Sequence, residues 1–444
     1  MADITAVIRA KRVVLPEGER AASVAIAGET IEAIGAFEQD FNCGNIIELA
    51  DDEVLLPGLI DAHVHVNEPG RTEWEGYASA TKAAAAGGIT TLIDMPLNSK
   101  PSTTSLENLR IKQDSTESKL MMDVGFWGGA IPGNTPNLDA MWNAGVFGFK
   151  CFLGDSGLEE YPFLNRDELR EAMEEIARIG GLLIVHAEDA EVLSEAPPAR
   201  GGDFTTFMNS HPASAEDAAI ASVVEAMRET GCRAHILHLA SAQALPIIRA
   251  AKAEGLPLTV ETCPHYLTFD SEKVPDGATQ YKCCPPLRDS ENRKGLWEGL
   301  ADGTIDFIAS DHSPCVAELK NMDTGDFGTA WGGIASVQLG FPAVWTQAKA
   351  LGHTLGDVAR WMGQTPAKLL GITGKGEIKV GNQADFAIVA PEETFEVRKE
   401  ELFHKNQVSP YDLRALTGVV RSTWLAGQPI DLDAPRRGRM ISRI

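Results

Sequence analysis

The sequence predicts an α/β protein: a (β/α)8 TIM barrel with a small β-sandwich domain built from both chain ends. Eight short apolar runs alternate with helical stretches along the middle of the chain, the pattern of parallel βα units. Segments rich in β-branched residues stand at both ends. Side chains able to bind metal ions close several of the eight runs, where a barrel carries its chemistry.

The two chain ends have the pattern of half-buried antiparallel strands, because alternating apolar residues are broken by Gly, Glu and Asp. The N-terminal runs are residues 5–15, 21–37 and 45–57. Residues 376–397 repeat the pattern, and residues 423–430 look like a hairpin. We expect residues 1–55 and 376–444 to form one split β-sandwich domain around a barrel domain of residues 56–375.

The middle of the chain supplies the barrel strands. The eight apolar runs are residues 55–66, 88–96, 122–130, 145–153, 181–189, 232–240, 256–266 and 304–314. Helical stretches such as 166–181 and 214–231 lie between them, beginning at charged or hydroxyl residues and ending at Gly. Eight such repeats favour a barrel, and periodicity alone leaves a doubly wound open sheet as the alternative.

Composition limits the kind of partner. The 444 residues are 44% hydrophobic and 23% charged, and 39 Lys and Arg against 63 Asp and Glu give a net charge of −24. Such acidity disfavours nucleic acids and anionic membranes, so we expect a small-molecule substrate. The N-terminus has no apolar leader, no run approaches the roughly 20 residues of a membrane span, and the seven cysteines form no CxxC pair. We therefore expect a cytoplasmic protein.

The first and fourth runs contain candidate metal ligands. His63 and His65 are two residues apart, so on a strand both imidazoles can face one metal ion, although such a pair can also be ordinary polar positions. Lys150 lies within an apolar run, where a charged amine is costly to bury. It could extend its amine to solvent or pair with a carboxylate. Alternatively, its pKa is depressed and CO₂ converts it into a carbamate that bridges two ions.

The fifth, sixth and eighth runs add further candidates. His186 ends the fifth run. His235 and His238 in the sixth are three apart, and we expect them to face opposite sides. His238, nearer the strand end, is the candidate, with His235 a core or helix-facing residue. Asp311 ends the eighth run, with His312 on the opposite face, and a carboxylate there can ligate a metal and transfer a proton.

These residues together predict a dinuclear hydrolase site. Four imidazoles, one carboxylate and one carbamate suit two divalent ions, with Zn²⁺ as the first choice. The predicted ligands are His63, His65, Lys150, His186, His238 and Asp311, with Asp311 also the catalytic acid–base residue. The remaining candidates are weaker: His265 could line the mouth, Cys283 and Cys284 could be thiolate ligands or offer backbone contacts, and His211, His353 and His404 are expected to be surface or packing residues.

The motifs resemble the amidohydrolase superfamily, specifically its cyclic amidohydrolases, over nearly the whole chain. PGLIDAHVH, GFKCF, DHSP and the closing GEIKVGNQADF carry the resemblance. It implies two Zn²⁺ ions bridged by a carbamylated Lys150 and a hydroxide, acting on a cyclic amide. Relatives in this group are commonly tetramers or dimers, so it also implies a homo-oligomer.

Local motifs favour one branch of that group. Dihydroorotases usually have an Arg where this chain has Asn67, and hydantoinases a Tyr where it has Asp155. EPGRTEWEGY, DMPLNS, KCCPPLRD and AWGGIAS resemble allantoinases, although Cys284 replaces the more usual Ser. This resemblance implies hydrolysis of allantoin, a neutral cyclic ureide, to allantoate in purine catabolism. Candidate substrate contacts are Cys284, Ser313, Gly333 and Arg71.

Two other functions remain open. One is ring opening of the hydantoinase or dihydropyrimidinase type. The other, from a different class, is a non-catalytic barrel that serves in assembly, like the dihydropyrimidinase-related cytoskeletal proteins.

Overall fold

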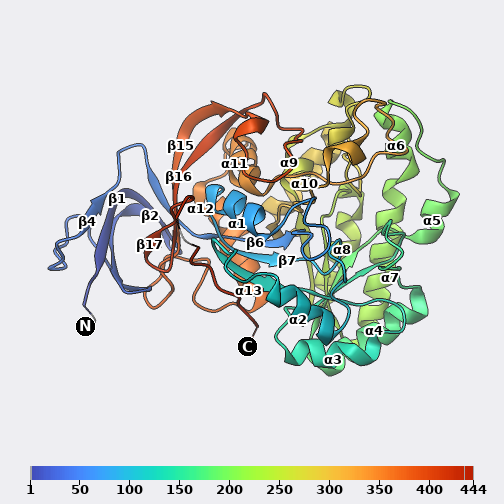
Figure 1. Ribbon diagram of the computed structural model, residues 1–444, viewed down its shortest axis with the longest axis horizontal. Helices are drawn as coiled ribbons and strands as arrows, with labels where there is room; N and C mark the ends of the chain where they lie inside the picture. Colours follow the sequence, from blue (N-terminus) through green and yellow to red (C-terminus); the bar gives the residue numbers. More distant parts are fainter. Residues whose placement is uncertain (1–2, 435, 444) are drawn as a thin grey trace.

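The chain forms a closed barrel with a β-sheet domain at its side (Figure 1). The computed structural model describes residues 3–434 and 436–443. Residues from the middle of the chain form the barrel, and both chain ends form the sheet, so the predicted fold class is confirmed. The predicted domain boundaries at 55/56 and 375/376 stay a prediction, and residues 1, 2, 435 and 444 of those segments lie outside the described residues.

Each of the eight predicted runs contains a barrel strand. The strands are β6 (Leu59–Val64), β7 (Ile89–Asp94), β8 (Asp123–Phe126), β10 (Phe149–Phe152), β11 (Leu182–His186), β12 (Arg233–Ile236), β13 (Leu258–Thr262) and β14 (Phe307–Ile308), with the short β9 (Gly128–Gly129) beside β10. Neighbouring strands pair in parallel. Phe147 N donates to Phe126 O at 3.0 Å, and Val64 bridges His312, which closes the ring.

Helices surround the barrel and cover its apolar outer face. They are α1 (Tyr77–Ala86), α2 (Leu106–Asp114), α3 (Thr135–Asn143), α4 (Arg166–Arg178), α5 (Ala190–Glu195), α6 (Phe204–Ser210), α7 (Ala213–Thr230), α8 (Leu245–Ala253), α9 (Pro264–Thr268), α10 (Ser290–Ala301), α11 (Gly340–Ala350), α12 (Leu355–Ala359) and α13 (Thr365–Leu370). The predicted start and stop signals operate in two of them. Asn165 and Glu168 form a capping box at α4, and α7 ends at Gly231 with φ of 68°.

The β domain is one eight-stranded sheet to which both chain ends contribute. Its strands are β1 (Ala6–Leu15), β2 (Gly18–Ala27), β3 (Thr30–Gly35), β4 (Ile46–Glu48), β5 (Val54–Pro57), β15 (Phe386–Glu396), β16 (Ala415–Leu425) and β17 (Gln428–Pro429). The order is β17-β16-β15-β5-β1-β2-β3, with β4 also on β1. Leu55 of β5 pairs with Val13 on one side and Ile388 on the other, so β5 joins the two ends. Ile8, Val24, Phe386 and Trp424 share the domain core.

The C-terminal segment returns to the barrel. Val124 N donates to Arg439 O, and Ile441 N donates to Val124 O, both at 2.9 Å. Arg443 N then donates to Gly145 O at 3.1 Å, just before β10. The tail therefore lies beside β8 at the end of the barrel opposite the mouth.

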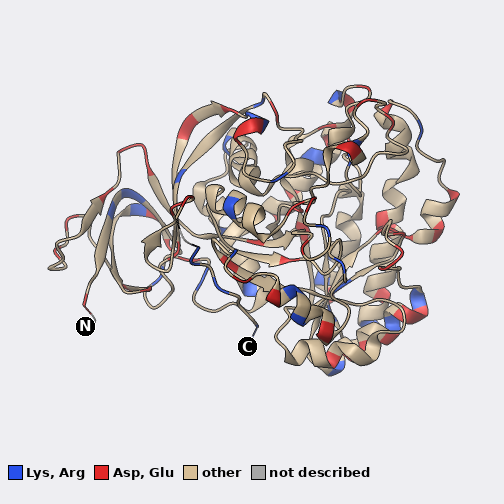
Figure 2. Ribbon diagram, viewed as in Figure 1, with Lys and Arg blue, Asp and Glu red and all other residues tan. Residues whose placement is uncertain are grey.

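Charged positions are spread over both parts of the molecule, with acidic and basic residues together on helices such as α4 (Figure 2). Within residues 3–434 and 436–443, no helix combines the length and the apolar character needed to cross a membrane.

Candidate functional site

Two histidines of the first barrel strand share one carboxylate. His63 lies in β6 and His65 directly follows it, and both are buried. His63 Nε2 lies 3.1 Å from Asp311 Oδ1, and His65 Nε2 lies 3.6 Å from the same oxygen. The i, i+2 spacing thus places both imidazoles on one face, at the mouth of the barrel.

Asp311 reaches this position through an uncommon backbone conformation. It follows β14 with φ of 44°, in the left-handed region that non-glycine residues rarely adopt. Such strain is tolerated where the surrounding structure imposes it, and it gathers at functional sites. Burial opposes the charge of the carboxylate, but the nearby imidazoles of His63, His238 and His65 together outweigh burial and hold the pKa of Asp311 well below its ordinary value. The carboxylate also lines a cavity that opens over the histidines.

The Lys150 amine lies inside the barrel mouth, near the first two histidines. Its Nζ is 3.5 Å from His63 Nε2 and 5.1 Å from the centre of the Phe152 ring. The side chain is 1% exposed, so it does not extend to solvent. No carboxylate lies within 4.0 Å of its Nζ in the described part of the chain, which leaves it without an ion pair. Burial lowers the pKa of Lys150 to about 8, and this favours the neutral amine.

His186 and His238 form a second pair beside the first. His186 ends β11, and its Nδ1 lies 3.0 Å from His238 Nε2. The His238 ring is centred 5.3 Å from that of His63, which joins the two pairs. Burial lowers the pKa of both His186 and His238, so both imidazoles are neutral, as metal ligands must be. His238 Nδ1 has no hydrogen-bond partner.

Strand alternation does not place His235 and His238 on opposite sides in the structure. β12 ends at Ile236, and His238 has φ of 36°, so the two residues do not share one regular strand. His235 also points into the barrel, where its ring stacks on Phe307 at 5.1 Å. Of the two expected alternatives, a core or a helix-facing residue, His235 is a core residue, and its ring lies inside the barrel beside Glu261.

Glu261 is a buried carboxylate that was not among the predicted site residues. It lies in β13, and its Oε1 is 2.5 Å from His63 Nδ1, while its Oε2 is 3.2 Å from His235 Nε2. It also accepts a hydrogen bond from His238 N at 3.3 Å. The charges of His63 and His235 overcome burial and lower the pKa of Glu261 below its ordinary value. The sequence did contain a signal for Glu261, because it is a charged residue within the apolar run LTVET, just as Lys150 is a charged residue within its own apolar run.

A second missed carboxylate, Glu188, connects the site to a loop. Its Oε2 lies 2.8 Å from His186 Nε2, and its Oε1 lies 2.9 Å from His211 Nδ1. His211 comes from the short connection between α6 and α7, and it lines the cavity. Its expected role as a surface or packing residue was therefore incomplete, because tertiary packing brings this loop to the barrel mouth. His353 and His404 do pack, His353 against Trp297 and His404 beside His312.

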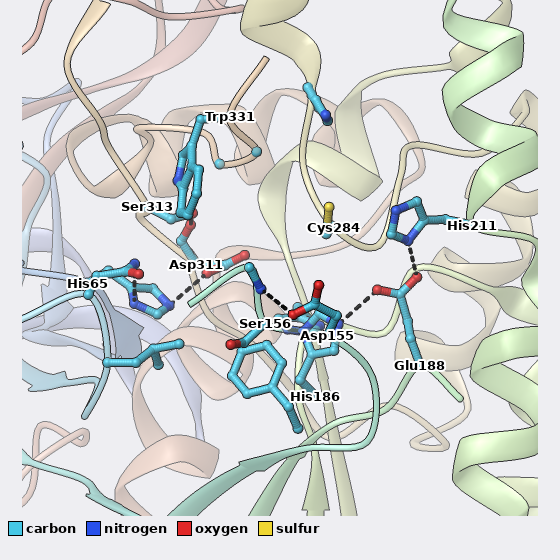
Figure 3. Close-up of a pocket in the computed structure, with 18 of the residues that line it drawn as sticks. His65, Asp155, Ser156, His186, Glu188, His211, Cys284, Asp311, Ser313 and Trp331 are labelled. Carbon is cyan, nitrogen blue, oxygen red and sulfur yellow. Dashed lines mark hydrogen bonds and ion pairs between the residues drawn. The ribbon is translucent and has the colours of Figure 1, made fainter. Parts of the chain in front are cut away.

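A cavity of about 430 Å³ opens over the histidines (Figure 3). Cys284 and Ser313 line it, and Cys284 lies across the cavity from His65 and Asp311. Gly333 also lines it and has φ of 125°; an added Cβ would lie 2.2 Å from Ser313 O, so only glycine fits there. The Gly333 backbone is already paired, since its N–H donates to Lys282 O at 2.8 Å and its carbonyl accepts from Lys320.

Arg71, the fourth expected substrate contact, lies behind the cavity wall. It donates to Asn98 O at 2.9 Å and to Glu160 at 2.8 Å, and it is not among the cavity-lining residues. Asn98 in turn donates to His65 Nδ1 at 3.3 Å. Arg71 therefore supports the loop that orients His65, because a hydrogen bond to one imidazole nitrogen directs the other toward the site.

The donor atoms are placed so that they could hold metal ions. Candidate ligand atoms of His63, His65 and Asp311 lie within 4.8 Å of one another, and all three residues are buried. His186 and His238 offer two further imidazoles beside them, and the Lys150 amine lies next to His63. Neutral imidazoles with a carboxylate are the donors that Zn²⁺ prefers. The residues fit a metal centre.

Known proteins resemble this chain in sequence. The model of the amidohydrolase family matches residues 54–430. An allantoinase from Streptomyces avermitilis is 52% identical over 100% of this chain and 100% of its own length. An allantoinase from Saccharomyces cerevisiae is 44% identical over 86% of this chain and 83% of its own, and one from Arabidopsis thaliana is 42% identical over 95% and 87%.

Solved structures resemble its fold. The L-hydantoinase (dihydropyrimidinase) from Arthrobacter aurescens superposes with a TM-score of 0.91 over 99% of this chain and 100% of its own, at 27% identity. A dihydropyrimidinase from Brevibacillus agri gives 0.88 over 98% of each chain, at 25% identity. The match of the family model to most of the chain, with relatives this similar along its length, shows that the chain belongs to the amidohydrolase family.

Proposed function

We propose that this chain hydrolyses the cyclic amide bond of allantoin to give allantoate, as a step in purine or ureide catabolism. The observation that carries the proposal is the full-length similarity, at 52% identity, to an allantoinase. The site supports the reaction class, because imidazoles and a carboxylate converge beside a cavity large enough for a small ring.

Two divalent ions, Zn²⁺ as the first choice, are proposed to occupy the donor cluster. The ligand set would be His63, His65, Lys150, His186, His238 and Asp311. When bound, such ions supply Lewis acidity toward the ring carbonyl and an activated water at neutral pH. The short separations between the donors support this assignment.

Lys150 is proposed to act as a carbamate. Its neutral amine would add to the carbon of CO₂, form an N–C bond while one C=O bond becomes a C–O bond, and release one proton, which converts a neutral group into an anion with two oxygen donors. Burial, which lowers the pKa of Lys150 to about 8, increases the fraction of the neutral amine that this addition requires. The carbamate oxygens would stand next to His63, where Nζ already lies 3.5 Å from Nε2.

Asp311 is proposed to move the proton of the reaction. It would take a proton from the attacking water and return it to the ring nitrogen that leaves when the amide C–N bond breaks. Its position on the cavity wall supports this role. The charge of His63 lowers the Asp311 pKa in the chain alone, and the neutral imidazole required of a metal ligand removes that charge.

Asp155 is proposed to recognise the ureido arm that distinguishes allantoin from simple hydantoins. It lies five residues after Lys150, and its carboxylate stands at the cavity among the labelled side chains of Figure 3. Its Oδ1 accepts from Gly157 N at 2.9 Å, whereas its Oδ2 has no hydrogen bond to another described residue. A free carboxylate oxygen accepts the N–H groups of a ureido arm, and it cannot donate to an oxyanion.

Ring opening of hydantoins or dihydropyrimidines is the second candidate. The fold likeness to the Arthrobacter L-hydantoinase, at 27% identity, favours it. Asp155 argues against it, because an acceptor stands where such enzymes usually carry a tyrosine donor. Relative rates on allantoin and on hydantoin separate the two functions.

A non-catalytic assembly role is opposed by the intact donor cluster. Metal analysis of the purified chain tests this role together with the proposed function. We expect about two divalent ions per chain, with allantoate formed from allantoin and lost after chelation. A chain that binds no metal and leaves allantoin intact would support the assembly role.

The proposed partner, compartment and oligomeric state are consistent with this function. The partner would be a neutral cyclic ureide of low molecular weight, with no nucleic acid or membrane partner, since the chain has a net charge of −24. We place it in the cytoplasm as a homo-oligomer, a tetramer or a dimer. One relative, from Aquarana catesbeiana, is named a mitochondrial allantoinase.

A further inference from the structure

A second cluster of metal-binding side chains lies on the far side of Asp311. Cys263 directly follows β13, and His265 lies in the first turn of α9. The Cys263 sulfur, a ring nitrogen of His265 and a carboxylate oxygen of Asp311 lie within 4.8 Å of one another. Cys263 and His265 are both fully buried, and neither lines the cavity over the histidines.

His265 is conspicuous for its missing partners. Neither Nδ1 nor Nε2 has a hydrogen-bond partner, although the ring is 0% exposed. Buried polar groups are nearly always paired in folded proteins, and an unpaired one costs stability. Burial lowers the pKa of His265 to about 4, so the ring is neutral with one lone pair free. A cation between His265 and Asp311 would satisfy that lone pair.

The three donors differ in type from the main cluster, because they include sulfur. Burial raises the pKa of Cys263 well above its ordinary value, so the free side chain is a thiol. A divalent cation would replace the thiol proton: the metal–sulfur bond forms, the S–H bond breaks and the proton leaves to solvent. Sulfur, imidazole and carboxylate together suit borderline and soft cations such as Zn²⁺ and Cd²⁺.

Asp311 belongs to both clusters, since its oxygen also lies 3.1 Å from His63 Nε2. We propose that Cys263, His265 and Asp311 form a third, inhibitory cation site that takes Zn²⁺ in excess or Cd²⁺. A cation there competes for the Asp311 carboxylate and removes it from proton transfer. Cation binding at this site does not depend on the proposed function. The expected inhibition does rest on the proposed function.

Cadmium gives this site a signal of its own. The ligand set proposed for the two catalytic ions contains no sulfur, so a thiolate-to-cadmium charge-transfer band in the ultraviolet reports a cysteine ligand. CdCl₂ is titrated into the zinc-loaded chain, with the bound metals counted by mass spectrometry. Cys263→Ser and Cys263→Ala are compared with Cys284→Ser, which removes the thiol that faces the cavity. Retained zinc and unchanged far-ultraviolet circular dichroism verify the fold of each variant.

We expect one cadmium per chain with the charge-transfer band, two zinc ions retained, and the band kept in Cys284→Ser and lost in both Cys263 variants. His265→Gln should weaken cadmium binding at least tenfold. Cadmium should inhibit ring opening in the unchanged chain and not in Cys263→Ser, whose rate without cadmium should equal that of the unchanged chain.

Three results would overturn the proposal: no band, a band that survives in Cys263→Ser, or a band lost in Cys284→Ser. Cysteine-dependent binding without inhibition would overturn the sharing of Asp311. If the chain does not open allantoin at all and yet shows the Cys263-dependent band, the cation site stands and the proposed function fails.

Discussion

Glu261 Oε1 lies 2.5 Å from His63 Nδ1, on the side of the ring opposite Asp311. The carboxylate thus fixes which nitrogen of His63 carries the proton and leaves Nε2 free to face the barrel mouth. Second carboxylates of this kind orient the histidines of metal sites and raise their basicity. The tautomer of His63 therefore depends on Glu261, a residue of another strand.

Replacement of Glu261 by Gln tests this dependence. We expect zinc affinity to fall about 10–100-fold, because the amide cannot accept the His63 proton as a carboxylate does. Zinc competition with a chromophoric chelator measures the affinity. Glu216→Gln is the matched control, since Glu216 is also buried but accepts from Ala240 N rather than from a histidine. Equal losses of affinity in the two variants would contradict the orienting role.

Replacement of Asp311 by Asn tests its part in proton transfer. The amide keeps an oxygen donor and loses the base, so kcat on allantoin should fall about 10²–10⁴-fold. Metal analysis should find most of the zinc still bound. A variant with nearly normal kcat would remove Asp311 from the proposed mechanism. His63→Ala and Lys150→Ala should lose metal and activity together.

The depressed pKa of Lys150 predicts how carbamylation depends on pH. Below a pKa of about 8 the amine is protonated and cannot add to CO₂; above it the amine is neutral. At fixed dissolved CO₂, the rate of carbamylation of the metal-free chain should rise with pH and level off above about 8. A ¹³C signal from labelled CO₂ measures it. A rate that keeps rising toward the ordinary lysine pKa of roughly 10.4 would show that burial does not depress the amine.

Asp155 should select for the ureido arm. Asp155→Leu removes a hydrogen bond to a charged acceptor, worth about 1.5–3 kcal/mol, so kcat/KM on allantoin should fall roughly 10–150-fold. Hydantoin lacks the arm, and its kcat/KM should change little. Glu159→Leu, at an exposed position nearby, is the control. Equal losses on both substrates would mean that Asp155 serves the ring or the fold.

Lys112 should contribute strongly to stability. Its Nζ donates to Asp94 Oδ2 at 2.7 Å with both side chains fully buried, and Asp94 Oδ1 accepts from Val66 N, next to His65. Lys112→Met leaves a buried carboxylate without its cation, which costs about 3–5 kcal/mol. A lower urea midpoint would show it. The exposed Lys294→Met should leave the midpoint unchanged.

The fold and the place of the site could be predicted because each barrel strand has a clear local pattern. His63 and His65 reveal their common face through their spacing, and Lys150 is visible as a charge within an apolar run. His238 was among the predicted ligands, but the strand alternation used to separate it from His235 does not apply, because β12 ends at Ile236 and His238 has a positive φ.

Residues that contact the predicted ligands, or that reach the site from distant loops, were harder to predict from the sequence. Glu261 acts through His63, and His211 reaches the site only through the packing of α6 and α7 against the barrel. Arg71 differs in the opposite sense, because it was predicted to contact the substrate. In the structure it donates to the backbone of a loop and does not line the cavity. Local sequence contains no record of such long-range contacts.

The most direct test of the central claim is kcat/KM of the zinc-loaded chain on allantoin, with hydantoin, dihydrouracil and dihydroorotate measured in parallel. The proposed function predicts a preference for allantoin of at least ~100-fold, which is about 2.7 kcal/mol at the transition state. A preference for hydantoin or dihydrouracil would contradict the substrate assignment, while the metal centre and the role of Asp311 would remain.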